Sequence, residues 1–193
     1  KLMHKSGKVA ARAHVRAMKA CKPGLYEYQL QAEIEHEFAM AGANFPAYST
    51  IVGGGANGCI LHYVENRAVL NDGELVLIDA GCELDYYASD ITRAFPVNGR
   101  FSPEQKAIYE IVLEAQYAAI GVTQAGRHWN EPHDITVKVI TEGLKDLGLL
   151  KGDLDELIEK KAYTDFYMHR AGHWLGMDVH DVGDYKVDQH WRL

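Results

Sequence analysis

Apolar side chains recur every three to four residues in five segments of the chain, with polar residues between them, which is the pattern of amphipathic helices. Leu30, Ile34 and Phe38, for example, follow one another at four-residue spacing. Ser102, with Gln105 three positions later, forms a capping-box signature that marks the start of a helix. The pattern therefore predicts five helices, over residues 1–21, 25–41, 102–121, 131–147 and 153–161.

A different pattern occupies residues 74–96. The almost wholly apolar run 74–78 stops at Asp79, and a second run, 86–95, is rich in aromatic and β-branched residues. Turn-forming residues separate the two runs at 81–85. Short runs of this composition, bounded by turn formers, predict two β-strands joined as an antiparallel hairpin.

The predicted hairpin brings two carboxylates together. If its turn is centred between Leu84 and Asp85, Asp79 and Asp90 lie opposite each other on one face of the sheet. Two adjacent carboxylates repel, and burying them without a partner is costly. Either Arg93 or a lysine neutralises them, or a divalent cation binds an oxygen ligand from each strand. Packing gives no reason to end an apolar strand on an aspartate, so the pattern favours a metal, provided that a histidine completes the site.

The glycine cluster at residues 51–58 is typical of a loop that approaches a ligand with its backbone. No Gly-Lys-Ser/Thr motif follows it, which argues against a nucleotide-binding loop. We expect this cluster to be a mobile loop and residues 59–63 to form a short strand. His62 lies in that strand, and taken alone it is more typical of a structural histidine than of a ligand.

Three histidines, His169, His173 and His180, fall within twelve residues near the end of the chain. Four-residue spacing of the first two resembles a zinc pair on a helix, but Arg170 occupies the position of the glutamate in an HExxH motif. Glycines in the segment also weaken a helix. We therefore predict extended backbone from which the three imidazoles converge on one site.

Composition excludes several classes of protein. A net charge of -7 argues against a nucleic-acid-binding protein, and no apolar run is long enough to span a membrane. The basic residues of the first helix are typical of a solvated helix face rather than of a membrane-binding surface. Cys21, Cys59 and Cys82 form no CxxC pair, which predicts free thiols in a reducing compartment, the cytoplasm.

Four runs of sequence carry a resemblance to a known family: NGCILHY (57–63), VLIDAGCE (76–83), SDITRAFPVNGRF (89–101) and HWLGMDVHDVG (173–183). Together they resemble the pita-bread metallopeptidases, and within them the aminopeptidase P group. The likeness extends over nearly the whole chain, and the spacing of the predicted helices between the four runs agrees with it.

The resemblance implies an α+β pita-bread fold, with a curved sheet of antiparallel type flanked by helices and two pseudo-symmetric halves. Residues 1–193 would then form a partial catalytic domain whose second half is incomplete, and both ends look truncated. The family carries two further glutamate ligands on strands that follow the histidine region. This sequence ends before any such strand.

The same resemblance implies roles for six residues and a cofactor of two divalent metal ions, most typically Mn²⁺. Asp79, Asp90 and His173 would bind the metals, with Asp90 bridging them. His62, His169 and His180 would be the catalytic and substrate-binding histidines that line the pocket. Between the family's two histidines the usual pattern is similar to Gly-Leu-Ser, whereas Arg170-Ala171-Gly172 stands here, so Arg170 either alters specificity or points outward.

The activity implied is that of a metallo-aminopeptidase that releases the first residue of peptides with proline in second position, by attack of a metal-bridged hydroxide on the Xaa-Pro carbonyl. The expected partners are such peptides, with neither nucleic acid nor membrane, and a homo-oligomer stays open. Two related enzymes remain as alternatives, an Xaa-Pro dipeptidase (prolidase) and a methionine aminopeptidase. A catalytically inert peptide-binding module of the same fold is the alternative outside the enzymes.

Overall fold

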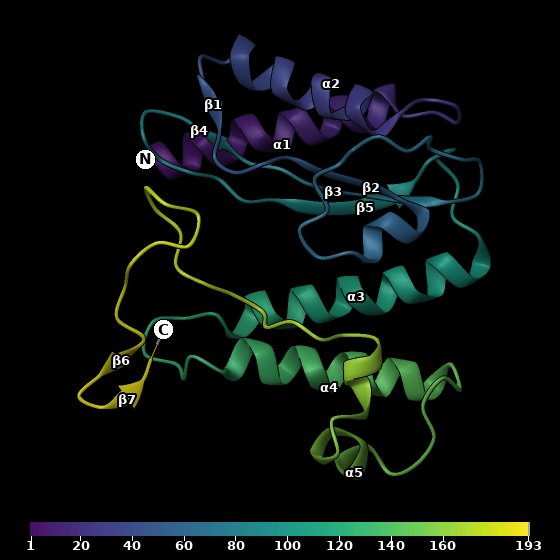
Figure 1. Cartoon of the computed structure of the whole chain (residues 1–193). Helices are drawn as coiled ribbons and strands as arrows, with labels where there is room; N and C mark the ends of the chain where they lie inside the picture. The colour runs from purple at the N-terminus through teal and green to yellow at the C-terminus, as the bar shows by residue number, and fades with distance from the viewer. Residues whose placement is uncertain (193) are drawn as a thin grey trace. The chain divides into compact units, whose positions relative to one another are not determined.

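The computed structural model describes residues 1–192, which fall into two units (Figure 1). The first unit contains residues 1–101 and 174–182, and the second contains residues 102–173 and the described residues from 183 onward. Each unit has its own hydrophobic core.

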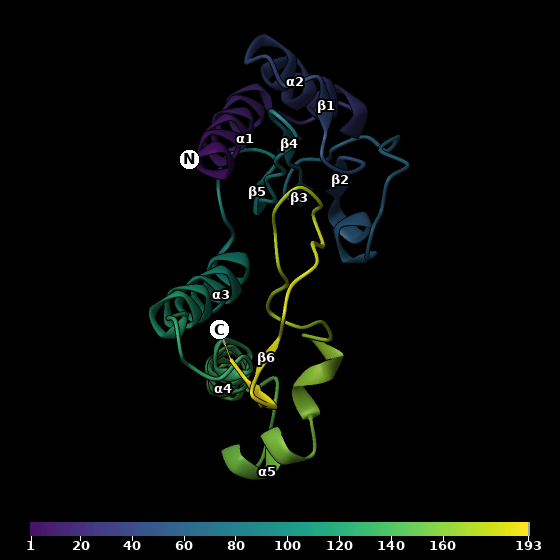
Figure 2. The same ribbon diagram turned by 90° about the vertical axis from the view of Figure 1, so that its left-hand side faces the viewer.

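The first unit packs two helices against a sheet. Helices α1 (Leu2–Ala20) and α2 (Glu27–Met40) confirm the first two predicted helices. The sheet is antiparallel, with the strand order β2 (Ile51–Gly54), β3 (Leu75–Asp79), β5 (Thr92–Pro96). Figures 1 and 2 show α1 and α2 side by side on one face of this sheet. The segment from 174 to 182 belongs to this unit too, and a hydrogen bond from the Ala88 N–H to Gly176 O attaches it.

The core of the first unit lies between these helices and the sheet. Leu30, Ile34 and Phe38 of α2 are buried, as their spacing predicts, and they belong to the same cluster as Val76 and Ile78 of β3. Each such side chain contributes roughly 1.5–3 kcal/mol when it is fully removed from water. Helix α1 meets this core with small side chains, which permit a close approach: Ala10, Ala13 and Ala17.

The hairpin exists, but its register differs from the prediction. Asp79 pairs with Thr92 rather than with Asp90. The chain reverses at Asp85 and Tyr86, whose φ angles are +50° and +71°. This two-residue turn sets the register of both strands, so the predicted turn centre was wrong by one residue and the predicted alignment by two.

The second strand is also shorter than predicted, because β5 begins at Thr92 rather than at residue 86. Residues 87–91, which precede β5, lie opposite residues 80–84 in the same register, but they form only isolated backbone hydrogen bonds and no continuous strand. Cys82 and Glu83 form β4, which pairs with β1 (Phe45–Pro46) in a second small sheet, and the reversal follows β4, flanked by the isolated bridge between Leu84 and Tyr87. The sheet that carries Asp79 therefore ends before the turn.

Gly81 permits the close approach of the two strands. A Cβ atom at this position would overlap the carbonyl oxygen of Ser89. The neighbouring hydrogen bonds cross at the same place: the Ala80 N–H donates to Ile91 O at 3.1 Å, and the Ser89 N–H donates to Cys82 O at 3.0 Å. Any larger residue at position 81 would separate the chain that ends in Asp79 from the chain that begins at Asp90.

The prediction of a mobile loop at the glycine cluster is wrong for its first half, since Ile51–Gly54 forms strand β2, paired with β3. A Cβ at Gly53 would lie 2.7 Å from the backbone nitrogen of Gly58, so glycine is required for the following 3₁₀ turn to fold back on the strand. The predicted strand over 59–63 is likewise wrong. That 3₁₀ turn, Gly55–Cys59, is followed by a loop in which His62 has a φ of +56°.

The second unit is helical. Helices α3 (Pro103–Val122), α4 (Glu131–Asp146) and α5 (Leu154–Glu159) confirm the remaining predictions, and α3 and α4 lie side by side (Figures 1 and 2). The capping box is present: Ser102 Oγ accepts from the Gln105 N–H at 3.2 Å, and the Ser102 N–H donates to Gln105 Oε1 at 3.0 Å. A 3₁₀ turn and a short hairpin complete the described part of the unit: Ala162–Asp165, β6 (Lys186–Val187) and β7 (His190–Trp191).

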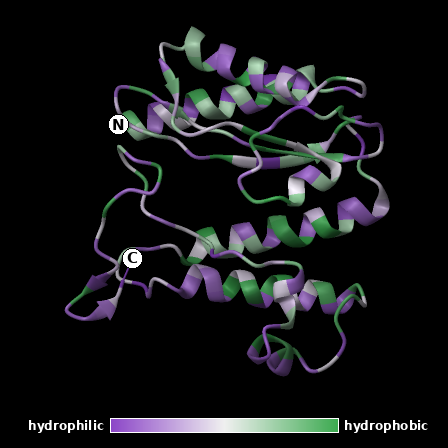
Figure 3. Ribbon diagram, in the orientation of Figure 1, coloured by the Kyte–Doolittle hydropathy of each residue, from purple (hydrophilic) through white to green (hydrophobic). Residues whose placement is uncertain are grey.

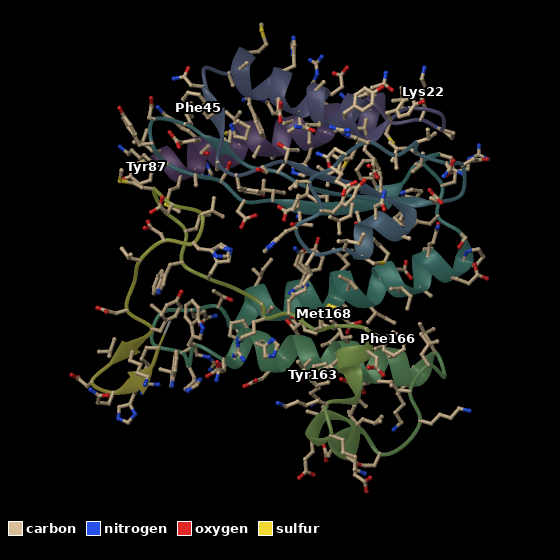
Figure 4. The ribbon with its side chains drawn as sticks, in the orientation of Figure 1. Lys22, Phe45, Tyr87, Tyr163, Phe166 and Met168 are labelled. Atoms are coloured by element: carbon tan, nitrogen blue, oxygen red, sulfur yellow. The ribbon has the colours of Figure 1, made fainter. Side chains whose placement is uncertain are left out.

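One apolar stripe of α3 is largely exposed. Ile108, Val112 and Ala115 share this stripe, but Ile108 is 38% and Val112 50% exposed, and of the three Ala115 alone is buried. Figure 3 shows hydrophobic residues along α3 and α4. In Figure 4, Phe166 and Met168 project from the segment after the 3₁₀ turn, and both are exposed. Among residues 1–192, no helix is long and apolar enough to cross a membrane.

His14 makes the stability of the first unit depend on pH. It is 3% exposed, its Nε2 lies 3.3 Å from Ala80 O, and its Nδ1 has no partner among residues 1–192. Burial lowers the pKa of this imidazole below its ordinary 6.5, an effect to which the charge of Arg93 adds. The unfolded chain therefore binds a proton that the folded chain does not, and the free energy of unfolding should fall as pH drops below about 6.5.

The variant His14→Gln tests this, because its amide can still donate to Ala80 O and does not titrate. We expect the melting temperature of the wild type to fall more steeply than that of His14→Gln between pH 7 and pH 5. Calorimetry across that range measures the difference. His36→Gln, which changes an exposed histidine of α2, is the control and should keep the wild-type slope. Equal slopes for wild type and His14→Gln would contradict the assignment.

Gly81→Ala should destabilise the protein by about 1–3 kcal/mol, since the added methyl group forces the strands apart. Urea unfolding followed by circular dichroism measures the change. Gly7→Ala is the matched control: Gly7 lies in α1 with nothing within 4 Å of its Cβ position, so alanine there should stabilise by about 0.5–1 kcal/mol. A Gly81→Ala protein as stable as the wild type would show that the strands separate without cost.

Candidate functional site

Asp79 and Asp90 lie together at the end of the sheet. Asp79 is the last residue of β3, and Asp90 precedes β5 by two positions. The Tyr48 hydroxyl donates to Asp79 Oδ1 at 2.5 Å and lies 3.0 Å from Asp90 Oδ1. One hydroxyl therefore reaches both carboxylates. The hairpin brings the acids together as expected, although diagonally across the strands rather than directly opposite.

The salt-bridge alternative for this pair does not hold for Arg93. Its Nη1 donates to Thr92 O at 2.7 Å, and the side chain is exposed. Within residues 1–192, Asp79 makes no ion pair with a lysine or an arginine. The negative charge of this pair is therefore not cancelled by the arginine that the sequence offered for that role.

The electrostatics of the pair favour a cation. Burial raises the pKa of Asp79 above its ordinary value and the charge of Asp90 raises it further, against the lowering effect of the Tyr48 hydrogen bond. Burial and the charge of Asp79 raise the pKa of Tyr48, so its hydroxyl keeps its proton. Carboxylate oxygens are the ligands that hard divalent cations prefer, so the donor set fits a divalent metal ion.

A pocket of about 510 Å³ opens over the acid pair. Two of the predicted pocket histidines, His62 and His180, line it together with Tyr48 and both aspartates. All of these residues belong to the first unit, so their grouping follows from the fold of that unit alone. The remaining lining residues are Ser49, Ile51, Val64 and Val179.

His180 reaches this pocket on the returning segment 174–182. The Ala88 N–H donates to Gly176 O at 2.8 Å and so anchors that segment to the chain just before Asp90. His62 precedes Asp79 in the sequence and lies in the loop after the 3₁₀ turn Gly55–Cys59. Residues other than glycine sparsely populate its φ of +56°. Such backbone is retained where the surrounding structure fixes it, and it is frequent at functional sites.

His169 and His173 belong to the second unit, in a segment without regular structure, as the glycines predict. The ring of His169 packs edge-on against Tyr167, with ring centroids 5.0 Å apart. Arg170 Nη2 donates to Asn130 Oδ1 at 2.7 Å, so the exposed arginine braces this segment against the start of α4. Of the two alternatives for Arg170, an outward orientation agrees with this contact.

Membership of His169 and His173 in the site stays a prediction. Within residues 1–192, no group of three or more His, Cys, Asp and Glu side chains is arranged to hold a metal ion. The grouped carboxylates are thus a pair, Asp79 and Asp90. The third ligand, His173, and the glutamates expected from the family resemblance stay predictions too.

Sequence reasoning missed Tyr48. This tyrosine lies 31 positions before Asp79 and 42 before Asp90, in a stretch, FPAYST, that shows no regular spacing to either. Its role depends on the pairing of β1 with β4, which places the stretch after β1 beside the end of β3. Only the tertiary structure reveals such a contact.

Comparison with known proteins relates nearly the whole chain to one family. The model of metallopeptidase family M24 matches residues 1–192. The Xaa-Pro aminopeptidase of Haemophilus influenzae is 53% identical over 189 residues, which are 98% of this chain and 44% of that protein. The chain therefore spans less than half the length of this relative.

Solved structures agree. The aminopeptidase PepP of Pseudomonas aeruginosa has a TM-score of 0.97 and 65% identity, over 100% of this chain and 43% of that one. A zinc-substituted aminopeptidase P of Escherichia coli, in complex with product, has a TM-score of 0.96 and 51% identity, over 100% of this chain and 44% of that one. These matches confirm the predicted α+β pita-bread fold class. The chain belongs to metallopeptidase family M24.

Proposed function

We propose that this chain is part of a metal-dependent aminopeptidase that removes the first residue of peptides with proline in second position. The observation that carries the proposal is the pocket in which Asp79 and Asp90 share the Tyr48 hydroxyl while His62 and His180 line the walls. The relative from Haemophilus influenzae, which is named an Xaa-Pro aminopeptidase, supports this specificity. The metal dependence follows the family.

The residues that would hold the metal are Asp79, Asp90 and His173, with Asp90 between two ions and Mn²⁺ as the proposed metal. Oxygen-rich ligation suits Mn²⁺, and the zinc-substituted relative shows that a related protein accepts another divalent ion. Bound divalent ions supply a water of lowered pKa and polarise a carbonyl group. Tyr48 keeps the two carboxylates together by its hydrogen bonds.

The histidines have roles that depend on the substrate. His180 lies in the pocket with the acid pair, where its imidazole would donate a hydrogen bond to the oxyanion that develops at the scissile carbonyl. Proline is a tertiary amide without an N–H, so the residue after the scissile bond is recognised by the shape of its ring. His62 and His169 would form walls for that ring. The free amine of the first residue would lie near a carboxylate, which restricts cleavage to the N-terminus.

We also propose that the protein acts in a reducing compartment, the cytoplasm. Cys21, Cys59 and Cys82 are all free thiols in the structure. Burial raises the pKa of Cys21 to about 11, which keeps that thiol protonated and inert. Structural disulfides are rare in the cytosol, where such thiols remain reduced.

An assay of three substrate classes tests the activity: Xaa-Pro dipeptides, longer peptides with proline in second position, and Met-Ala peptides. We expect the metal-loaded protein to cleave the longer Xaa-Pro peptides with the highest kcat/KM. A preference for dipeptides would indicate a prolidase, and a preference for Met-Ala would indicate a methionine aminopeptidase. Binding of peptides without any cleavage would indicate an inert module.

Asp90→Asn should abolish cleavage and reduce the metal content, because an amide supplies neither the charge nor the bridging oxygens of a carboxylate. Metal analysis of the purified protein and a peptide-cleavage assay measure the two effects. Asp155→Asn, which changes an exposed aspartate of α5, is the control and should retain both. Wild-type kcat in an Asp90→Asn protein stripped of metal would refute the role.

Tyr48→Phe should weaken divalent-metal binding by roughly 10–100-fold, the usual effect of removing a hydrogen bond that orients a metal ligand. Calorimetric titration of the chelator-treated protein with Mn²⁺ measures this directly. Tyr86→Phe removes a hydroxyl from a tyrosine that is 73% exposed, and it should leave the affinity unchanged. If Tyr48→Phe bound Mn²⁺ as tightly as the wild type, the hydroxyl would not be needed to orient the carboxylates.

A further inference from the structure

A second acidic group of the first unit is buried apart from the acid pair. Glu27, in the first turn of α2, is 0% exposed. Its Oε1 accepts hydrogen bonds from the Gly54 N–H at 2.8 Å and from Asn57 Nδ2 at 3.0 Å. Its Oε2 accepts from the Tyr63 hydroxyl at 2.8 Å and from the Ala68 N–H at 2.9 Å. Four donors thus converge on one carboxylate.

These bonds suit the ionised form of Glu27, because a carboxylate offers about four acceptor sites and a protonated acid would have to donate. Within residues 1–192, Glu27 makes no ion pair with a basic side chain. Its charge is balanced instead by the four donors and by the N-terminus of α2, which favours an acidic residue. Burying an anion without a cation is costly, and these charge-assisted hydrogen bonds offset that cost.

The four donors share one feature: they lie in the segment 54–68, which begins at the last residue of β2 and forms most of the connection to β3. The bonds attach the start of the segment at Gly54, its middle at Asn57 and Tyr63, and its end at Ala68. Beyond β2 the segment has a single 3₁₀ turn and no strand. Glu27 is therefore the common attachment point of a loop that lacks a sheet to support it.

His62 lies inside this attached loop, directly before Tyr63. Its left-handed backbone conformation, with φ at +56°, is unfavourable for a residue other than glycine and persists only where the surrounding structure fixes it. The Tyr63 hydroxyl donates to Glu27 Oε2 at 2.8 Å and accepts from Asn57 Nδ2 at 3.1 Å, so both contacts hold the residue that directly follows His62. The His62 side chain lines the pocket of the acid pair.

A second buried side chain attaches the same loop to the sheet. Asn66 Oδ1 accepts from the Val52 N–H at 3.0 Å, and its Nδ2 donates to Thr50 O and to Gln31 Oε1, both at 2.8 Å. This asparagine also has a left-handed backbone, with φ at +50°. The loop is thus attached to α2 and to β2 at separate points, and both points flank His62.

We propose that Glu27 is a positioning residue for His62, acting through the loop 54–68 to present the imidazole to the pocket of the acid pair. The proposal rests on the proposed function, since His62 acts there on the substrate. Glu27 itself touches neither the pocket nor the acid pair in any contact described above. Its effect on catalysis should therefore depend on the presence of His62.

A double-mutant cycle tests this dependence. In Glu27→Gln, one of the two carboxylate oxygens becomes an amide nitrogen that faces two donors, so hydrogen bonds to the loop are lost. We expect kcat/KM for an Xaa-Pro peptide to fall by roughly 10–100-fold, the loss expected for hydrogen bonds to a charged group. In a His62→Ala background the same change should alter kcat/KM by less than about twofold, because the coupling acts through the imidazole.

A measurement without substrate separates the proposal from the proposed function. The imidazole resonances of His62, followed by NMR in the metal-free protein, should shift and broaden in Glu27→Gln. Amide hydrogen exchange in residues 57–68 should accelerate at least about tenfold, while exchange in α3 and α4 stays at the wild-type rate. Affinity for Mn²⁺ should stay unchanged, because Glu27 does not contact Asp79 or Asp90.

Two further variants guard against a general loss of folding. Tyr63→Phe removes one of the four donors and should give a smaller loss of kcat/KM in the same direction, again absent with His62→Ala. Thr141→Val removes a fully buried hydroxyl that donates to Val137 O at 2.6 Å within α4, and it should lower stability while leaving His62 resonances unchanged.

The outcomes are distinct. Equal losses from Glu27→Gln with and without His62, or His62 resonances that do not change, would overturn the positioning role. A wild-type protein that cleaves no Xaa-Pro peptide would contradict the proposed function. In that case the NMR and exchange measurements still decide whether Glu27 positions His62.

Discussion

The first unit keeps two like charges together against their repulsion. Asp79 and Asp90 approach because the strand ending in one and the strand beginning near the other are drawn together at Gly81, where a side chain would overlap the Ser89 carbonyl oxygen. The Tyr48 hydroxyl then reaches both acids. Backbone hydrogen bonds across the hairpin supply the attraction that the carboxylates lack, so the geometry of the site depends on the hairpin.

The unit balances its buried acids in two different ways. Glu27 receives four hydrogen bonds and lies at a helix N-terminus, so its charge is satisfied by the protein itself. Both members of the acid pair lie within hydrogen-bond distance of the Tyr48 hydroxyl, and burial raises the pKa of Asp79. A bound cation would relieve the pair, whereas it would have no free acceptor at Glu27. This contrast explains why one acidic site suits a metal and the other suits the support of a loop.

Helix α2 contributes both to the core beneath the acid pair and to the support of the loop that carries His62. Its apolar stripe packs on the sheet that carries Asp79, and its first turn carries the carboxylate to which the loop of His62 is attached. A change in the core under α2 would therefore affect the pocket from two directions. Packing and polar contacts are thus combined in one helix, which connects stability to the placement of the pocket residues.

The sequence by itself determined the five helices, the hairpin, and the grouping of Asp79 with Asp90, because helical periodicity, capping residues and short apolar runs are local signals. It did not determine the register, which a two-residue turn at Asp85 and Tyr86 sets. Nor did it show that residues 51–54 form a strand, since Gly53 is required there by a close contact with the backbone of Gly58, which no local pattern reveals.

The contacts of Tyr48 and Glu27 were decided by tertiary structure alone. Both side chains act over separations of 27 to 42 positions, and no local pattern encodes such pairs. Residue type indicated which groups could bind a metal. Which of them meet, and which hydrogen bonds hold them there, followed from the way the hairpin, the loop and α2 pack around one core.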